Sequence, residues 1–200
     1  MATLCTPLNQ ICLQHVRLCH SQSSRKDAAV KRDRMNSDEP ADAHLTHTDA
    51  QGRAAMVDVA RKGATQRTAT AGATVRLGPA AFRLLRDNGL AKGDALAVAQ
   101  LAGIMASKQT SALIPLCHSL CLDHTSVSFE LDEAQSAALV TATCRSTGRT
   151  GVEMEALTAV SVAALTVYDM CKAVSYDIII TDVKLLRKTG GKRDFHRHPG

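Results

Sequence analysis

The sequence predicts an α+β fold in which helices pack on one face of a largely antiparallel sheet. The 200-residue chain is 45% hydrophobic, enough for one buried core and too little for two large domains. Segments that alternate like strands are interrupted by helical segments in no regular βαβ order. The apolar residues are mostly Ala, Val and Leu, with no Trp, so the core has to close with small side chains.

The first half of the predicted domain contains two strands and two helices. Strands are expected over residues 56–59 and 67–77, where Thr and Val are frequent, with Gly72 as a candidate β-bulge. Pro79 is expected to begin a helix over AAFRLLRDN, and Gly89 to end it. Asp94 is then a suitable N-cap for a second helix, which is rich in small residues and runs to Lys108.

The second half contains the longest helix. Residues 124–131 and 138–145 alternate as a pair of strands around the charged turn DEAQSA. The sequence STGRTG leads into a helical segment over residues 152–174, and a final strand is expected over residues 178–186. No internal repeat is visible.

Residues 1–43 differ in composition from the rest of the chain. No Asp or Glu precedes Asp27, whereas Arg17, Arg25 and Lys26 are present, a bias shared with mitochondrial transit peptides. The following KRDRMNSDEPADA segment has too few apolar residues to offset the entropy of ordering. We expect a disordered leader or linker over residues 1–43 and one domain over residues 44–200. The expected location is the mitochondrial matrix, with the cytoplasm as the alternative.

Composition disfavours several classes of protein. The net charge is +5, but basic residues are not clustered and aromatic residues are scarce, which argues against nucleic-acid binding. Seven Cys residues are an odd number in a chain too large to need disulfides, so a reducing compartment is expected. No run of eighteen apolar residues occurs, so we expect no transmembrane helix.

Both ends of the longest helix carry candidate chemistry. Asp169 and Lys172 are three residues apart and can form an ion pair on one helical face. If that end is buried, the pKa of the lysine shifts and the amine becomes a usable base. Glu153 and Glu155 lie in the first turn, where carboxylates favour the helix dipole. About 21 Å of helix separates Glu155 from Asp169, so a site that used both would be assembled from two subunits.

Two weaker patterns suggest other ligands. Lys92 lies just before a helix N-terminus, where a phosphate would meet both an ammonium group and free N–H groups. Residues 148–151 precede the longest helix and are a second candidate phosphate site for the same reason. However, an exposed lysine near a helix cap is common in proteins, so this position alone is a weak indication of a phosphate site. Zinc is an alternative ligand for the sequence CHSLCLDH, residues 117–124, but the spacing of its Cys and His residues is not that of a familiar zinc motif. In the alternating pattern of the following strand, Cys121 falls on the side expected to face the core.

Longer segments resemble cyclic pyranopterin monophosphate synthase, the MoaC family. These segments are LTHTDAQGRAAMVDV, AKGDALAVAQLAGIMASKQTSALIPLCH, TGRTGVEMEALTAVSVAALTVYDMCKAV and DVKLLRKTGGK, and the match covers residues 45–195. The resemblance implies a ferredoxin-like α+β fold, assembled as a hexamer, a trimer of dimers, with sites at dimer interfaces. It also implies conversion of (8S)-3′,8-cyclo-7,8-dihydroguanosine 5′-triphosphate into cyclic pyranopterin monophosphate with release of pyrophosphate, in molybdenum cofactor biosynthesis. The implied functional partner is the radical enzyme that makes the substrate.

The resemblance assigns roles residue by residue. It implies that Lys92, Asp169 and Lys172 are catalytic, with the lysines as acid and base in either order. Implied substrate contacts are Leu116, Cys117, His118, Met154 and Glu155, with Arg67, Glu153 and Lys188 as further pocket positions whose basic members face phosphates. Neither a metal site nor a cofactor is expected, although Mg²⁺ can accompany the triphosphate.

One departure from the family pattern falls near Lys188. Similar proteins have an extra Gly before Asp-Phe, whereas Arg193 directly precedes Asp194 here. Two rival functions use the same residues differently. One is a non-catalytic module that binds purine nucleotides or polyphosphate, and the other is a zinc-binding interaction protein.

Overall fold

The computed structural model describes residue 48 and residues 51–198. Its elements are β1 (Thr65–Arg76), α1 (Gly78–Arg86), α2 (Ala95–Ser107), α3 (Thr110–Leu113), β2 (His124–Asp132), β3 (Ala137–Gly148), α4 (Glu153–Cys171), β4 (Ile179–Thr189) and β5 (Phe195–His196). The leader predicted over residues 1–43 lies outside the described residues.

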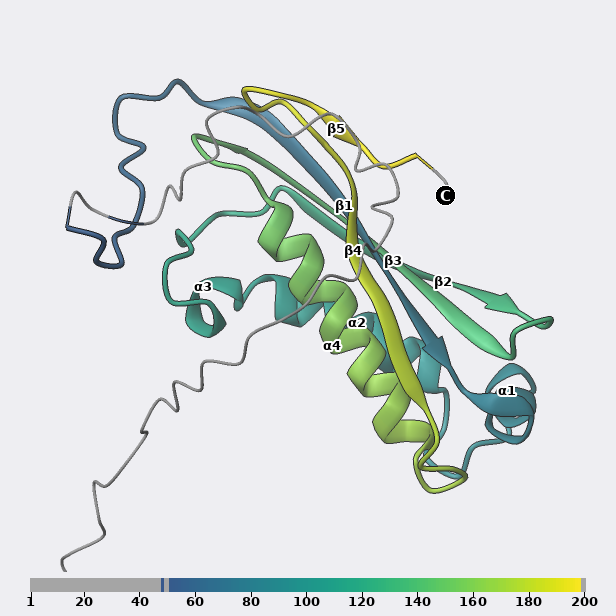
Figure 1. Ribbon diagram of the computed structural model, residues 1–200. Helices are drawn as coiled ribbons and strands as arrows, with labels where there is room; N and C mark the ends of the chain where they lie inside the picture. Colours follow the sequence, from purple (N-terminus) through teal and green to yellow (C-terminus); the bar gives the residue numbers. More distant parts are fainter. Residues whose placement is uncertain (1–47, 49–50, 199–200) are drawn as a thin grey trace, which may run out of the picture. The chain divides into compact units, whose positions relative to one another are not determined.

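The strands form one antiparallel sheet in the order β2-β3-β1-β4-β5. Helix α4 crosses β1, β3 and β4, and α2 lies beside α4 on the same face of the sheet (Figure 1). Along the chain, helices connect β1 to β2 and β3 to β4. In the sheet, β1 lies between β3 and β4. This arrangement confirms the predicted α+β class and the ferredoxin-like arrangement.

Small side chains close the core, as the composition predicts. Ala69, Ala71 and Ala73 of β1 are at most 4% exposed, and four alanines of α4 are buried in the same core. At Gly103 of α2, a Cβ atom would lie 2.9 Å from the carbonyl oxygen of Ala159. Helix α2 therefore packs directly on the backbone of α4, and this close approach fixes the position of the loop before α2.

Local signals predict the helix ends well. Asp94 caps α2, since its carboxylate accepts a hydrogen bond of 3.0 Å from the Ala97 backbone N–H. At the end of α1, the N–H of Gly89 donates to the Leu84 carbonyl at 2.8 Å. The residue with left-handed backbone there is Asn88, with φ of 51°, and not Gly89.

The strand predicted over residues 56–59 is wrong. These residues belong to no strand, and their side chains alternate between exposed and half-buried. The carbonyl of Val57 accepts a hydrogen bond from His118 Nε2 at 3.0 Å. The alternating exposure of residues 56–59 thus arises because this segment lies against the 114–123 loop, and not because it is a strand of the sheet.

The bulge predicted at Gly72 is present, but the extra residues belong to β4. Pairing between β1 and β4 shifts between Thr70 and Ala71 and again between Gly72 and Thr74. A Cβ at Gly72 would lie 3.1 Å from a methyl group of Leu186, so the glycine makes room for the irregular partner strand. Strand β4 continues to Thr189, three residues beyond its predicted end, and α3 and β5 were not predicted.

By length and composition, α4 is the one described helix apolar enough to cross a membrane, with a mean hydropathy of 1.3. Buried residues make up 56% of its apolar stretch. Its apolar character thus fits its place as the main helix covering the sheet.

Candidate active site

A carboxylate and two ammonium groups meet at the C-terminal end of α4. Lys92, from the loop before α2, donates to Asp169 Oδ2 at 2.9 Å and to the Asp169 carbonyl at 2.8 Å. Lys172 Nζ lies 2.6 Å from Asp169 Oδ1. The side chains are 44–54% exposed. The structure thus brings together the three residues that the resemblance implies are catalytic.

Charge pairing dominates the protonation of this cluster. Hydrogen bonds from Lys172 and Lys92 lower the pKa of Asp169 to about 2. The hydrogen bond to Asp169 in turn raises the pKa of Lys172. The shift of the Lys172 pKa was expected only if this end of α4 is buried, and in the single chain that condition is not met, because the side chains are exposed and the nearest charge is opposite.

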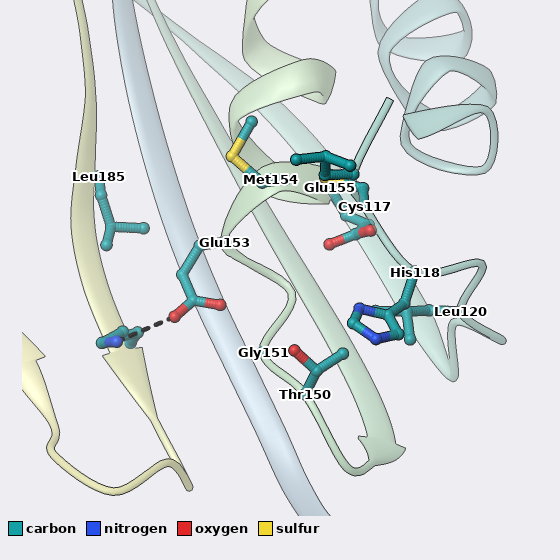
Figure 2. A pocket seen from close by; sticks show the side chains of 11 residues that line it. Cys117, His118, Leu120, Thr150, Gly151, Glu153, Met154, Glu155 and Leu185 are labelled. Carbon is teal, nitrogen blue, oxygen red and sulfur yellow. Dashed lines mark ion pairs between the residues drawn. The ribbon is translucent and has the colours of Figure 1, made fainter. Parts of the chain in front are cut away.

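A cavity of about 350 Å³ lies at the other end of α4. It is lined by Leu116, Cys117, His118, Leu120, Thr150, Gly151, Glu153, Met154, Glu155, Leu185 and Lys188. Figure 2 shows Cys117, His118 and Glu155 along one side of the cavity, and Glu153 and Leu185 along the other. The predicted substrate contacts from the 116–118 loop and from the first turn of α4 therefore share one cavity.

Glu155 and His118 give this cavity acid–base character. Glu155 is only 4% exposed, and burial raises its pKa. The same burial raises the pKa of the Cys117 thiol, so the thiol stays protonated at neutral pH. Because the Val57 carbonyl only accepts, His118 Nε2 carries the proton in their 3.0 Å hydrogen bond. In the neutral ring, Nδ1 is then an acceptor.

A second, basic cavity of about 470 Å³ adjoins the first. The two cavities share Thr150, Gly151, Glu153 and Lys188. Lys188 Nζ forms an ion pair of 3.0 Å with Glu153 Oε1 at their boundary, the dashed line in Figure 2. Arg67 lines the basic cavity, and its Nε is buried with no hydrogen-bond partner among the described residues.

The predicted site residues thus form two groups at opposite ends of α4. Lys92, Asp169 and Lys172 lie at one end, and the eight predicted substrate-contacting residues line the two cavities at the other. Sequence reasoning missed Leu120, Lys62, Lys192 and Arg193. These four residues lie in loops, and no local sequence pattern marks them as functional. Arg149 and Thr150, in contrast, belong to the STGRTG loop that the sequence analysis had indicated. Within the described residues, no three His, Cys, Asp or Glu side chains lie close enough to hold a metal ion.

Comparison with known proteins places the chain in a family. A sequence model described as "MoaC family" matches residues 56–191. The chain belongs to the MoaC family. All of the site residues named above lie within that match except Lys192 and Arg193, which follow it directly.

MoaC-family relatives fall into two groups by length. Curated proteins named "Molybdenum cofactor biosynthesis protein 1" are 61% identical over 159 residues in Bos taurus and 56% identical over 180 residues in Homo sapiens. These matches cover 79% and 90% of this chain but only 25% and 28% of the relatives, so the chain spans about a quarter of their length. A protein of Rhodospirillum rubrum named "Cyclic pyranopterin monophosphate synthase" is 55% identical over 79% of this chain and 96% of its own length.

Proposed function

We propose that this chain is a cyclic pyranopterin monophosphate synthase of molybdenum cofactor biosynthesis. It would convert 3′,8-cyclo-7,8-dihydroguanosine triphosphate into the cyclic pyranopterin and release pyrophosphate. Membership of the MoaC family and the nearly full-length match to bacterial proteins of that name support the proposal. The observation that carries it is the convergence of Lys92 and Lys172 on Asp169, since two amines around one carboxylate suit repeated proton transfer.

The proposed roles follow from the charges. Lys172 is an ammonium group at neutral pH, and Asp169 raises its pKa further, so its first role is to donate a proton. Asp169 stays ionised and orients both amines. On the other side of the substrate, Glu155 and His118 would position the ring system, and the basic cavity would neutralise the phosphates. No resident cofactor is invoked, and Mg²⁺ would arrive with the triphosphate.

A complete site requires a second copy of the chain. The two groups of residues lie at opposite ends of α4, too far apart for one small substrate. Between them, the outer faces of α2 and α4 expose Leu101, Met105 and Leu165, each at least 58%. A two-fold axis near Val162, midway between Glu155 and Asp169, would cover this apolar face and bring Asp169 of one copy to Glu155 of the other.

The larger assembly and the cellular setting stay predictions. The hexamer, a trimer of such dimers, rests on the resemblance. So does the functional partnership with the radical enzyme that supplies the substrate. The mitochondrial matrix is proposed from the composition of residues 1–43, with the cytoplasm as the alternative.

Substitution of Lys172 tests the proposed activity. Lys172→Ala is expected to lower turnover of the cyclised nucleotide by at least about 100-fold, the usual scale for removing a general acid. The matched control is Lys184→Ala, which removes another half-exposed lysine paired with an aspartate, on β4. Product is measured as a fluorescent pterin after oxidation, and circular dichroism checks the fold.

Two results would contradict the proposal. Near-normal turnover by a folded Lys172→Ala protein would remove Lys172 from catalysis. Calorimetry that shows tight nucleotide binding by the wild-type protein, with no pterin formed, would favour the non-catalytic nucleotide-binding module instead.

A further inference from the structure

The 114–123 loop forms one side of the first cavity, and its last residues are anchored to β3. It connects α3 to β2. The Asp123 N–H donates to the Arg145 carbonyl at 2.8 Å. Thr147 Oγ1 donates to Asp123 Oδ2 at 2.9 Å, in an exposed contact. These two hydrogen bonds fix the point at which the loop enters β2, because Asp123 directly precedes that strand.

A third anchor, from Ser146, is buried. Ser146 lies between Arg145 and Thr147 on β3, and it is 2% exposed. Its Oγ donates to the Cys121 carbonyl at 2.7 Å. Water has little access to a side chain this deeply buried, so solvent replaces the hydroxyl poorly as the donor to that carbonyl. Ser146 therefore ties the loop to the sheet three residues after His118, which lines the cavity.

The other contacts of the loop are weaker determinants of its orientation on the sheet. Leu120 and Leu122 pack against the core, and apolar contacts of this kind are not directional. Ser119 Oγ donates to Ser111 Oγ at 3.1 Å, but this contact is exposed and joins the loop only to α3. The buried hydrogen bond from Ser146 is therefore the contact that sets how the loop is turned towards the cavity.

The orientation of the loop governs the tautomer of His118. His118 Nε2 donates to the Val57 carbonyl at 3.0 Å, and in the neutral ring Nδ1 is then the acceptor. Val57 belongs to no strand or helix, so the sheet holds His118 through the loop and not through Val57. A loop that moves away from β3 lengthens the bond to Val57, and the ring is then free to carry its proton on either nitrogen.

We propose that Ser146 is a positioning residue for His118. Its hydroxyl holds the loop in the orientation in which His118 keeps its proton on Nε2 and offers Nδ1 as an acceptor to the substrate. Ser146 itself lines neither cavity and acts only through the loop. The consequence for turnover rests on the proposed function, whereas the consequence for the imidazole ring does not.

Nitrogen NMR of the full chain tests the positioning without turnover. The chemical shifts of the two ring nitrogens show which one carries the proton, and His118→Ala assigns the signals. With the ring neutral, the wild type is expected to show the Nε2–H form, and Ser146→Ala a mixture of both forms. The matched control is Ser107→Ala, because Ser107 is also 2% exposed but donates to the Ile104 carbonyl, at 2.8 Å. An unchanged ring in Ser146→Ala, or an equal change in both variants, would overturn the proposal.

Steady-state kinetics tests the same link in the reaction. Ser146→Ala is expected to raise KM for the cyclised nucleotide roughly tenfold, the scale of one lost hydrogen bond, with kcat little changed. The reason is that His118 positions the substrate, whereas the amines at the other end of α4 are untouched. Ser107→Ala should keep the KM of the wild type. A shifted ring with an unchanged KM would overturn the claim that this positioning serves the substrate.

The two measurements separate this inference from the proposed function. Normal synthase turnover, with neither the ring nor KM altered in Ser146→Ala, would overturn the inference and leave the proposed function standing. A ring that depends on Ser146 in a wild-type protein with no synthase turnover would support the positioning and overturn the proposed function. If Ser146→Ala does not fold, Thr147→Val, which removes the neighbouring anchor at Asp123, is measured in the same way.

Discussion

The carboxylate of Asp169 is held by two ammonium groups, and this contact sets the charge of the whole cluster. Its folded-state pKa of about 2 lies below the ordinary value of 3.8. The stabilisation from these ion pairs is therefore complete above the ordinary value and is lost only as the pH falls towards 2. At neutral pH Asp169 is therefore ionised, and the pKa of its partner Lys172 is raised by the same contact.

Glu155 behaves in the opposite way and yields a stability prediction. It is the one buried charged residue among those described, and burial raises its pKa. With a folded pKa above the unfolded one, its destabilising effect is absent below the unfolded pKa and grows as the pH rises through the folded pKa. Glu155→Gln should therefore raise the unfolding temperature at pH 7 more than at pH 4, while it lowers synthase turnover.

Thermal unfolding followed by circular dichroism at the two pH values measures this effect. Glu130→Gln is the control, because Glu130 is an exposed glutamate on β2. If Glu155→Gln is destabilised by the same amount at both pH values, the carboxyl group makes a contact that outweighs its burial.

At the level of elements, the close contact of α2 with α4 yields the next prediction. Alanine favours an exposed helix over glycine by about 1 kcal/mol. At Gly103, however, the added Cβ would lie 2.9 Å from the Ala159 carbonyl and 3.2 Å from the Ala163 Cβ. Overpacking of this kind costs about 1–3 kcal/mol. Gly103→Ala should therefore lower the free energy of unfolding despite its better helix propensity.

Urea unfolding measures the change, with Gly63→Ala as the control, since a Cβ at Gly63 meets no atom within 4 Å. Because Lys92 lies just before α2, turnover should fall as well when α2 is displaced from α4. An unchanged or higher urea midpoint for Gly103→Ala would mean that the helices separate without cost.

Elements with strong local signals were predictable, and those made by tertiary contacts were not. Helix α2 has a capping Asp94, and α4 has a long apolar pattern, so both were found from the sequence. Residues 56–59 alternate because they lie against the loop of His118, which no local pattern distinguishes from a strand. The two-residue strand β5 depends on pairing with β4 and has no periodicity of its own.

The same distinction applies to the site. Asp169 and Lys172 share a helical face, so their contact follows from spacing. The contact of Lys92 with Asp169, 77 residues away, depends on the packing of α2 on α4. Arg193 joins Arg67 only because the loop after β4 folds back on β1. A sequence pattern can identify the residue types, but the fold determines which of them meet.

At the scale of the whole molecule, the proposed shared site makes a quantitative prediction. Glu155→Ala and Asp169→Ala should each be inactive, because each damages both sites of a dimer. When the two proteins are mixed and exchange subunits, each hybrid dimer has one site with both substitutions and one site with neither. Random exchange makes half of the dimers hybrids, so turnover should recover to about a quarter of the wild-type value.

The matched control is a mixture of Asp169→Ala with Lys172→Ala. These residues lie at the same end of α4 in one chain, 2.6 Å apart, so every site in the hybrid keeps one damaged residue. Turnover should not recover in this mixture, and differently tagged subunits show that exchange has occurred. Recovery in both mixtures would mean that Asp169 and Lys172 of one chain serve different sites, which contradicts the proposed cluster. No recovery in either mixture, with exchange shown, would place each complete site within one chain. The residues at the two ends of the 19-residue helix α4 would then have to act on one substrate without a second subunit.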